Sequence, residues 1–161
     1  MATTHSEGAR ARLGAPIRRS EIIERAESWL RPSVAYSTTK FHHNEFGIYR
    51  TDCSGYVSMA WGLPGLPLNV RGGLDTLGLA TASDPVERDD LRAGDVLLRT
   101  EGSRLIRHVA VFHEWADDDR TAYWGFEQSG GTGTVHRRIT YPYGGQEHFL
   151  PRRYVNLARA S

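Results

Sequence analysis

The spacing of apolar residues changes along this chain, from a helical period in its first part to strand-like runs in its second part. One apolar stripe with a helical period begins near Ser20 and ends before Pro32, and a second stripe runs from Cys53 to Trp61. After residue 95, apolar runs of strand length alternate with turns. Helices that precede strands favour an α+β fold in which N-terminal helices pack on an antiparallel β-sheet.

The second part of the chain contains four predicted strands. We expect them at residues 96–99, 108–113, 121–128 and 134–140, with Tyr154 and Val155 closing the sheet. The acidic turn at 116–120 joins the second and third strands into a hairpin. Residues 33–51 predict a loop rather than a helix or strand, and the connector up to residue 90 contains one candidate helix, at 74–79.

Length and composition predict one domain. A chain of 161 residues, 39% hydrophobic and 10% aromatic, is typical of a single globular core. Residues 1–18 have no period and no apolar signal core, so we expect a flexible leader ahead of one domain over residues 19–161. No stretch approaches the roughly 20 apolar residues of a membrane span. We therefore expect a soluble monomer without an export signal, either cytoplasmic as written or the mature part of a secreted bacterial protein.

The balance of charges excludes several kinds of partner. Twenty Lys and Arg residues against nineteen Asp and Glu residues leave a net charge of +1, and the arginines form no basic run. We therefore expect no nucleic-acid partner and no anionic membrane surface. Two patterns could suggest a metal, the pair His42-His43 and the acidic run 117–119, but both lack the ligand spacing that a metal site needs. The sequence predicts no metal and no cofactor.

Cys53 is the only cysteine of the chain, so it can form neither an internal disulfide nor a multi-cysteine metal site. It lies at the first turn of its predicted helix, where unpaired backbone N–H groups and the helix dipole stabilise a thiolate. A thiolate nucleophile needs an imidazole partner, and His108 is the best candidate because it opens a predicted buried strand. The alternative is that Cys53 packs as a small apolar residue and His108 is an ordinary core histidine.

Three blocks of residues follow one another along the chain: Thr51-Asp52-Cys53-Ser54-Gly55-Tyr56-Val57, then Leu91-x-x-Gly94-Asp95-Val96-Leu97, then His108-Val109-Ala110-Val111-Phe112. Together they resemble the signature of the NlpC family of papain-like cysteine peptidases, which are bacterial cell-wall endopeptidases. The resemblance covers residues 20–128. It implies a papain-like α+β core, in which the helix that begins at the cysteine packs against an antiparallel sheet that contains the histidine.

The resemblance also implies roles for particular residues. Cys53 is the expected nucleophile, His108 is the expected base, and the Tyr36 hydroxyl is expected to line the oxyanion side of the site. Asp52 and Ser54, on either side of the cysteine, belong to the same candidate oxyanion and substrate region. The third, orienting residue of the family is usually a histidine, and the matching stretch 123–129 contains none.

Two residues are candidates for the orienting role. Glu127 aligns best, and its carboxylate would accept a hydrogen bond from the far ring nitrogen of His108. Gln128 is the alternative, since neighbouring residues of a strand point to opposite faces and only one of the two can face the site. Several aromatic residues nearby either line a substrate groove or pack within the sheet: Tyr123, Trp124, Phe126, Tyr141 and Tyr143.

The function that the resemblance implies is hydrolysis of an amide through a thioester on Cys53. The bond would lie in a peptidoglycan stem peptide, commonly between D-glutamate and a diamino acid, so the expected partner is a peptide or muropeptide substrate. The chain departs from the family where Ser37-Thr38-Thr39 replaces the Gly-Gly pair that commonly follows the tyrosine. Two alternatives stay open. A cytoplasmic papain-like acyltransferase or amidase of small-molecule metabolism would form the same thioester, and a catalytically silent binding module would fit the absent third histidine.

Overall fold

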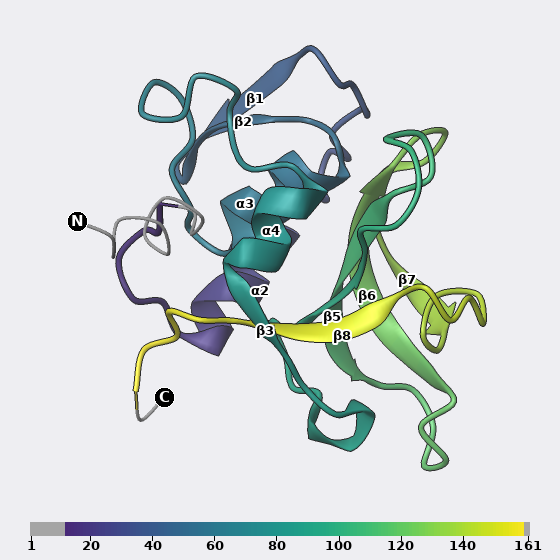
Figure 1. Cartoon of the computed structure of the whole chain (residues 1–161). Helices are drawn as coiled ribbons and strands as arrows, with labels where there is room; N and C mark the ends of the chain where they lie inside the picture. The colour runs from purple at the N-terminus through teal and green to yellow at the C-terminus, as the bar shows by residue number, and fades with distance from the viewer. Residues whose placement is uncertain (1–11, 160–161) are drawn as a thin grey trace.

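Three helices and a short hairpin lie beside a six-stranded antiparallel sheet in the computed structural model, which describes residues 12–159 (Figure 1). The helices are α2 (Arg19–Glu27), α3 (Cys53–Ala60) and α4 (Thr76–Thr81), and a 3₁₀ turn covers Arg88–Asp90. The predicted α+β class with an antiparallel sheet is confirmed. No helix among the described residues is long and apolar enough to cross a membrane.

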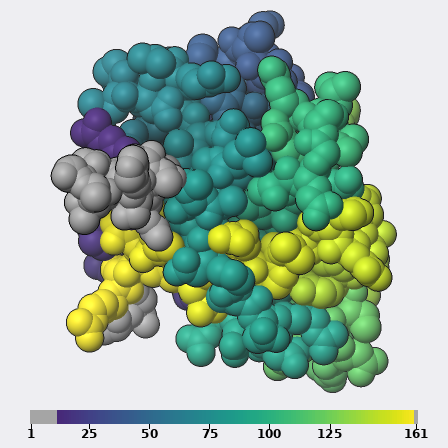
Figure 2. Space-filling model, in the orientation of Figure 1, coloured from purple at the N-terminus to yellow at the C-terminus, as the bar shows by residue number. Residues whose placement is uncertain are grey.

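The large sheet has the strand order β3-β8-β4-β5-β6-β7, and all neighbouring pairs are antiparallel. Its strands are β3 (Ser83–Pro85), β4 (Val96–Arg99), β5 (His108–Trp115), β6 (Ala122–Ser129), β7 (Gly133–Thr140) and β8 (Leu150–Tyr154). The four strands predicted for the second part of the chain are present, close to their expected bounds. The strand expected at Tyr154 and Val155 is β8, which begins earlier, ends at Tyr154 and lies between β3 and β4, so it does not close the sheet. Figure 2 shows its yellow segment crossing the surface between teal segments.

Residues 33–51 contain a β-hairpin, so the expected loop is wrong. Strands β1 (Phe41–Asn44) and β2 (Gly47–Arg50) pair with each other in a separate two-stranded sheet. In the tight turn between them, the Asn44 side-chain oxygen accepts the Phe46 N–H at 2.9 Å. The pattern of apolar residues does not predict this hairpin, because each strand has only four residues and β1 is largely solvent-exposed.

Helix α3 is buried on all sides. All eight of its residues are buried, because α2, α4, strand β2 and strands β5 and β6 surround it. Just after the helix, Trp61 is fully buried and donates its indole N–H to the Gly94 carbonyl at 2.9 Å. The helix shares one apolar cluster with Val109, Val111 and Phe126 of the sheet. This packing fixes α3 against β5 and β6, so residues on these three elements keep a defined spacing.

The fold includes residues that we expected to be a leader. Ile17 is only 5% exposed and belongs to the core. Its N–H donates to the Asn156 carbonyl at 3.2 Å, and its carbonyl accepts the Ala158 N–H at 2.8 Å. The expectation of a flexible segment over residues 1–18 is therefore wrong for its last part, and residues 1–11 lie outside the described residues. Leu13 also packs against this core, but two large apolar residues among polar ones are too few to predict an ordered segment.

Candidate active site

Cys53 is the first residue of α3 and lies in the wall of a cavity. Asp52 caps the helix, because its Oδ1 accepts the Gly55 N–H at 2.8 Å. A glycine is required at position 55, since a Cβ there would lie 2.0 Å from the Arg50 carbonyl oxygen. Cys53 itself is 8% exposed, and its backbone N–H belongs to the unpaired first turn. The motif around the cysteine therefore specifies a capped helix start that lies close against β2.

Arg50, a residue that the sequence analysis does not single out, holds this helix start in place. Its Nε donates to Asp52 Oδ2 at 2.7 Å, and its Nη2 donates to Ser54 Oγ at 3.0 Å. The guanidinium also donates to the backbone carbonyls of Arg71, Gly73 and Leu74. Asp52 and Ser54 line the cavity as expected, but their polar atoms already form hydrogen bonds within the protein. Capping and anchoring are thus the roles that their contacts support.

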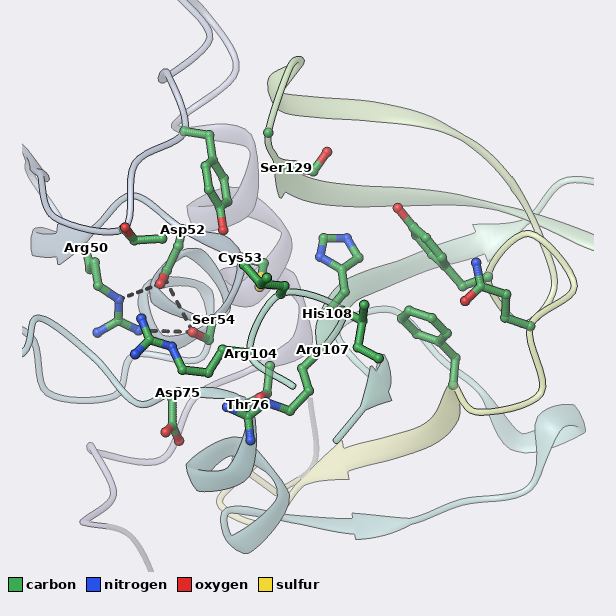
Figure 3. A pocket seen from close by; sticks show the side chains of 18 of the residues that line it. Arg50, Asp52, Cys53, Ser54, Asp75, Thr76, Arg104, Arg107, His108 and Ser129 are labelled. Atoms are coloured by element: carbon green, nitrogen blue, oxygen red, sulfur yellow. Dashed lines mark hydrogen bonds and ion pairs between the residues drawn. The ribbon is translucent and has the colours of Figure 1, made fainter. Parts of the chain in front are cut away.

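His108 is the first residue of β5, and it lies beside Cys53 (Figure 3). Its Nε2 is 2.7 Å from Glu127 Oε1, so Nδ1 is the ring nitrogen left for Cys53. Burial by itself lowers the pKa of His108, but its interactions with Cys53 and Glu127 raise it to about 9. The His108 ring therefore keeps its second proton at neutral pH.

Glu127 lies in β6, and its side chain is only 1% exposed. Tyr143 donates its hydroxyl to Oε1 at 2.6 Å, and Arg137 donates its Nε to Oε2. Burial raises the pKa of Glu127, but the hydrogen bonds from His108 and Tyr143 and the charges of His108 and Arg137 bring it below its ordinary value. Burial and the bond to Glu127 raise the pKa of Tyr143 to about 12, so its hydroxyl remains a donor. Glu127 is therefore an ionised carboxylate held by three donors.

Of the two candidates for the orienting residue, Glu127 is the one that contacts His108. Gln128 points away from it, and donates its side-chain N–H groups to the Val34 carbonyl and to Thr134 Oγ1, both at 3.0 Å. Gln128 is fully buried and does not line the cavity, so its expected place in the oxyanion and substrate region is wrong. The physical reason is the alternation of side chains along a strand. Gln128 instead anchors the segment that leads to Tyr36.

Tyr36 lines the same cavity as Cys53 and is 37% exposed. Burial raises the pKa of its phenol, the negative charges of Cys53 and Asp52 raise it further, and Arg50 lowers it. These interactions require the phenol to lie within electrostatic reach of the cysteine. The structure therefore brings together Cys53, His108, Glu127 and Tyr36 from four separate segments of the chain.

The cavity beside Cys53 has a volume of about 530 Å³. The residues that line it come from the end of β2 and the start of α3, the loop before β1, the segment 71–76 that leads into α4, the β4–β5 loop, the end of β6 with the turn that follows, and the segment between β7 and β8. Tyr143 and Phe149 stack with ring centroids 4.5 Å apart, and the His108 ring meets Tyr143 edge-on at 5.0 Å. Of the five aromatic residues considered from the sequence, Tyr143 lines the cavity and the other four do not.

Arg137 completes the site although the sequence analysis does not predict it. In the β6–β7 hairpin Glu127 pairs with Val135, so Arg137 lies two residues further along β7 on the same face of the sheet as Glu127. The signal that could have identified it is the register of this hairpin, which depends on the turn that joins the two strands. Without that register, Arg137 is one arginine among many.

The two patterns that could have suggested a metal have structural roles. His42 packs edge-on against Trp29 with ring centroids 5.2 Å apart. Asp117 accepts the Thr121 N–H at 2.9 Å within its turn. Within residues 12–159, no group of three or more His, Cys, Asp or Glu side chains is arranged to hold a metal ion.

No family model matches the chain, and no curated protein is significantly similar to it. The geometry of the site therefore provides the support for a function.

Proposed function

We propose that the protein is a papain-like thiol hydrolase of the NlpC type, which cleaves an amide bond through a thioester on Cys53. The observation that supports this proposal is the chain of contacts from Cys53 to His108 and from His108 to Glu127. The three residues come from α3, β5 and β6, so only the folded protein brings them together. A nucleophile, a base and an orienting carboxylate in this order can perform acyl transfer.

In the first half of the reaction, Cys53 Sγ attacks the amide carbonyl carbon as a thiolate. The carbon–nitrogen bond then breaks, and His108 donates a proton to the leaving amine nitrogen. The products of this half are a thioester on Cys53, a free amine and a neutral imidazole. Because the pKa of His108 is about 9, its imidazole holds the proton that this step needs at neutral pH.

In the second half, water attacks the thioester carbon. His108 accepts a proton from the water as the carbon–oxygen bond forms, and the carbon–sulfur bond then breaks. The products are a carboxylic acid and the Cys53 thiolate beside a protonated His108. Glu127 stays ionised throughout, because its hydrogen bonds lower its pKa, and it keeps the imidazole in one orientation.

The tetrahedral intermediates of both halves contain an oxyanion that needs hydrogen-bond donors. We assign the backbone N–H of Cys53 and the hydroxyl of Tyr36 to this role. The raised pKa of Tyr36 keeps its hydroxyl protonated, which a donor requires. Gln128 acts through Val34 on the segment before Tyr36 and is a positioning residue.

The substrate class that we propose is a peptide, and a peptidoglycan stem peptide is the first to test. The motif blocks resemble those of cell-wall endopeptidases, and this resemblance is the reason for the choice. The cavity of about 530 Å³ falls within the range of small-ligand pockets, so it offers room for a short peptide segment.

The pH–rate profile of Cys53 alkylation by iodoacetamide tests the catalytic pair. We expect fast alkylation well below pH 8 in the native protein, because an imidazolium partner stabilises the thiolate, whereas a free thiol has a pKa of about 8.5. His108→Ala should lose this reactivity. His43→Ala is the matched control, because His43 is exposed and outside the cavity. An ordinary thiol profile in the native protein would contradict the proposal and favour a silent binding module.

Digestion of purified muropeptides tests the reaction and its substrate, with Cys53→Ala as the inactive control. Release of a new amine and a new carboxylic acid, whatever amine acceptor is added, supports the hydrolase. Transfer of the acyl group to an added amine would contradict the hydrolase and favour the acyltransferase. No product from any muropeptide, together with a reactive Cys53, would contradict this substrate class alone.

A further inference from the structure

Two arginines of the β4–β5 loop line the cavity without a partner. Neither Arg104 nor Arg107 forms a side-chain hydrogen bond or an ion pair with any residue of the described range 12–159, and the Nε of Arg107 is buried. Arg50, in the same cavity, donates to two side chains and three backbone carbonyls. Figure 3 shows Arg104 and Arg107 below Cys53 and His108 in the view. Their guanidinium groups therefore remain available to a ligand.

The carboxylates of the cavity do not neutralise these two arginines. Asp52 is ion-paired with Arg50 at 2.7 Å. Asp75 caps α4, where its Oδ1 accepts the Gly78 N–H at 2.8 Å. Neither carboxylate lies within ion-pair distance of Arg104 or Arg107. The β4–β5 loop therefore adds positive charge to the cavity next to the reactive pair.

The loop presents the arginines in a defined shape. The N–H groups of Ile106 and Arg107 both donate to the Ser103 carbonyl at 3.1 Å. A buried N–H without an acceptor is unfavourable, so the Nε of Arg107 would gain from an acceptor on a ligand. A guanidinium is a planar fork of donors that matches a carboxylate in charge and geometry. The missing partner is therefore an anionic group with two acceptor oxygens.

We propose that Arg104 and Arg107 bind a carboxylate of the substrate, and so select amides that have an acidic group near the bond to be cleaved. This inference rests on the proposed function, because Cys53 must be the reacting group for the arginines to act on the same molecule. Arg107 contributes the buried donor, and Arg104, which is exposed, contributes a second charge. Both are specificity-determining residues, and neither exchanges a proton in the reaction.

Two alkylating reagents that differ only in charge test this inference, N-iodoacetyl-β-alanine and its neutral carboxamide. The measured quantity is the ratio of their second-order rate constants at Cys53, anionic over neutral, divided by the same ratio for N-acetylcysteine. We expect a ratio above one in the native protein, which added salt lowers. Arg107→Gln should lower it by about five- to tenfold, and Arg104→Gln by about two- to fivefold. The rate with the neutral reagent, measured beside it, corrects the ratio for any effect of the lost charge on the reactivity of Cys53 itself.

Matched variants keep the test interpretable. Arg31→Gln is the control, because Arg31 is exposed and outside the cavity, and it should leave the ratio unchanged. Arg107→Lys keeps the charge but not the planar fork, so it should retain part of the preference. Should Arg107→Gln fail to fold, the exposed Arg104 still tests the inference through its own variant.

Each outcome separates the carboxylate site from the proposed function. An unchanged ratio in both glutamine variants would overturn the carboxylate site, while fast neutral alkylation would leave the catalytic pair intact. Ordinary thiol kinetics with both reagents in the native protein would contradict the catalytic pair itself. Inorganic phosphate and acetate, compared as competitors at equal ionic strength, form the last arm. If phosphate slows alkylation by the anionic reagent more than acetate does, the arginines would be assigned to a phosphoryl group, and the proposed carboxylate site would be overturned.

Discussion

The helix wall of the cavity, residues 50–54, differs from its sheet wall in how much of the chain builds it. We define the sheet wall as His108 and Tyr143, which line the cavity, together with Glu127 and Arg137, which are bonded to them without lining it. In the helix wall, one ion pair and one cap connect residues that are neighbours in the sequence. In the sheet wall, a single carboxylate joins residues from β5, β6, β7 and the segment after β7. A local motif thus places Cys53, whereas the positions of His108 and its partners depend on strand register.

The charges of the two walls differ as well. Arg50 and Asp52 neutralise each other, whereas Glu127 lies between the two positive groups His108 and Arg137. Apart from Cys53 itself, we therefore expect substitutions in the helix wall to act mainly on stability. Substitutions in the sheet wall should act mainly on the protonation of His108 and on rate.

The largest effect that we predict is that of Cys53→Ala. Amide hydrolysis should fall by about 10⁴-fold or more, because no other group can form the acyl intermediate. The free energy of unfolding should change little, since the two side chains are similar in size. Steady-state hydrolysis and urea unfolding measure the two quantities. Substantial hydrolysis by the variant would mean that neither wall contains the nucleophile.

Glu127→Gln should have the next largest effect, a loss of about 10²-fold or more in kcat/KM. The carboxylate is one of the groups that raise the pKa of His108 to about 9, so this pKa should fall in the variant. The imidazolium then becomes scarcer between pH 7 and 9, and alkylation of Cys53 at neutral pH should slow. NMR titration of His108 measures the pKa directly. Glu114→Gln, at an exposed position of β5, is the control. An equal fall in the pKa of His108 and in kcat/KM in this variant would contradict a special role of Glu127.

Arg50→Gln tests the helix wall. The Arg50 side chain is 10% exposed and donates to five groups, so its loss should lower the free energy of unfolding by about 2–4 kcal/mol. Arg137→Gln is the matched variant in the sheet wall. Arg137 is 45% exposed, so its loss should cost about 1 kcal/mol or less but should reduce activity. Urea unfolding measures both, and equal destabilisation would break the contrast between the walls.

Tyr143→Phe should have the smallest effect. It removes the hydroxyl that donates to Glu127 at 2.6 Å and keeps the stacked ring against Phe149. Because Glu127 retains its hydrogen bonds with His108 and Arg137, we expect kcat/KM to fall only about three- to tenfold, with the free energy of unfolding nearly unchanged. A loss as large as that of Glu127→Gln would show that the hydroxyl has a more direct part in the reaction.

The helix wall could largely be predicted from the sequence. Cys53 at the first turn of its helix follows from residue types and spacing, and the structure places it there. Asp52, which we expected in the oxyanion and substrate region, caps this helix. Arg50 could not be predicted, because its hydrogen bonds reach a loop more than twenty residues away along the chain. Long-range contacts of this kind leave no period in the sequence.

The sheet wall could be predicted only in part. His108 and Glu127 could be predicted from the strand patterns and from the resemblance to the NlpC family. The choice of Glu127 over Gln128 needed the actual face of β6, since alternation alone permits either. Tyr143 lies in the segment between two strands, whose path depends on tertiary packing and not on local pattern. The β1–β2 hairpin shows the same limit, because strands so short contain too few residues to establish a period.

Much of the cavity lining comes from three connecting segments, which contain Tyr36, Arg104 with Arg107, and Tyr143 with Phe149. Arg104 and Arg107 belong to neither apolar cluster of the core, whereas Phe149 is buried in one of them and Tyr143 packs against it. The loop of Arg104 and Arg107 can therefore diverge among descendants of this chain while Cys53 and His108 keep their alignment. Such a division lets one scaffold acquire new substrates by exchange of surface segments, at little cost to folding.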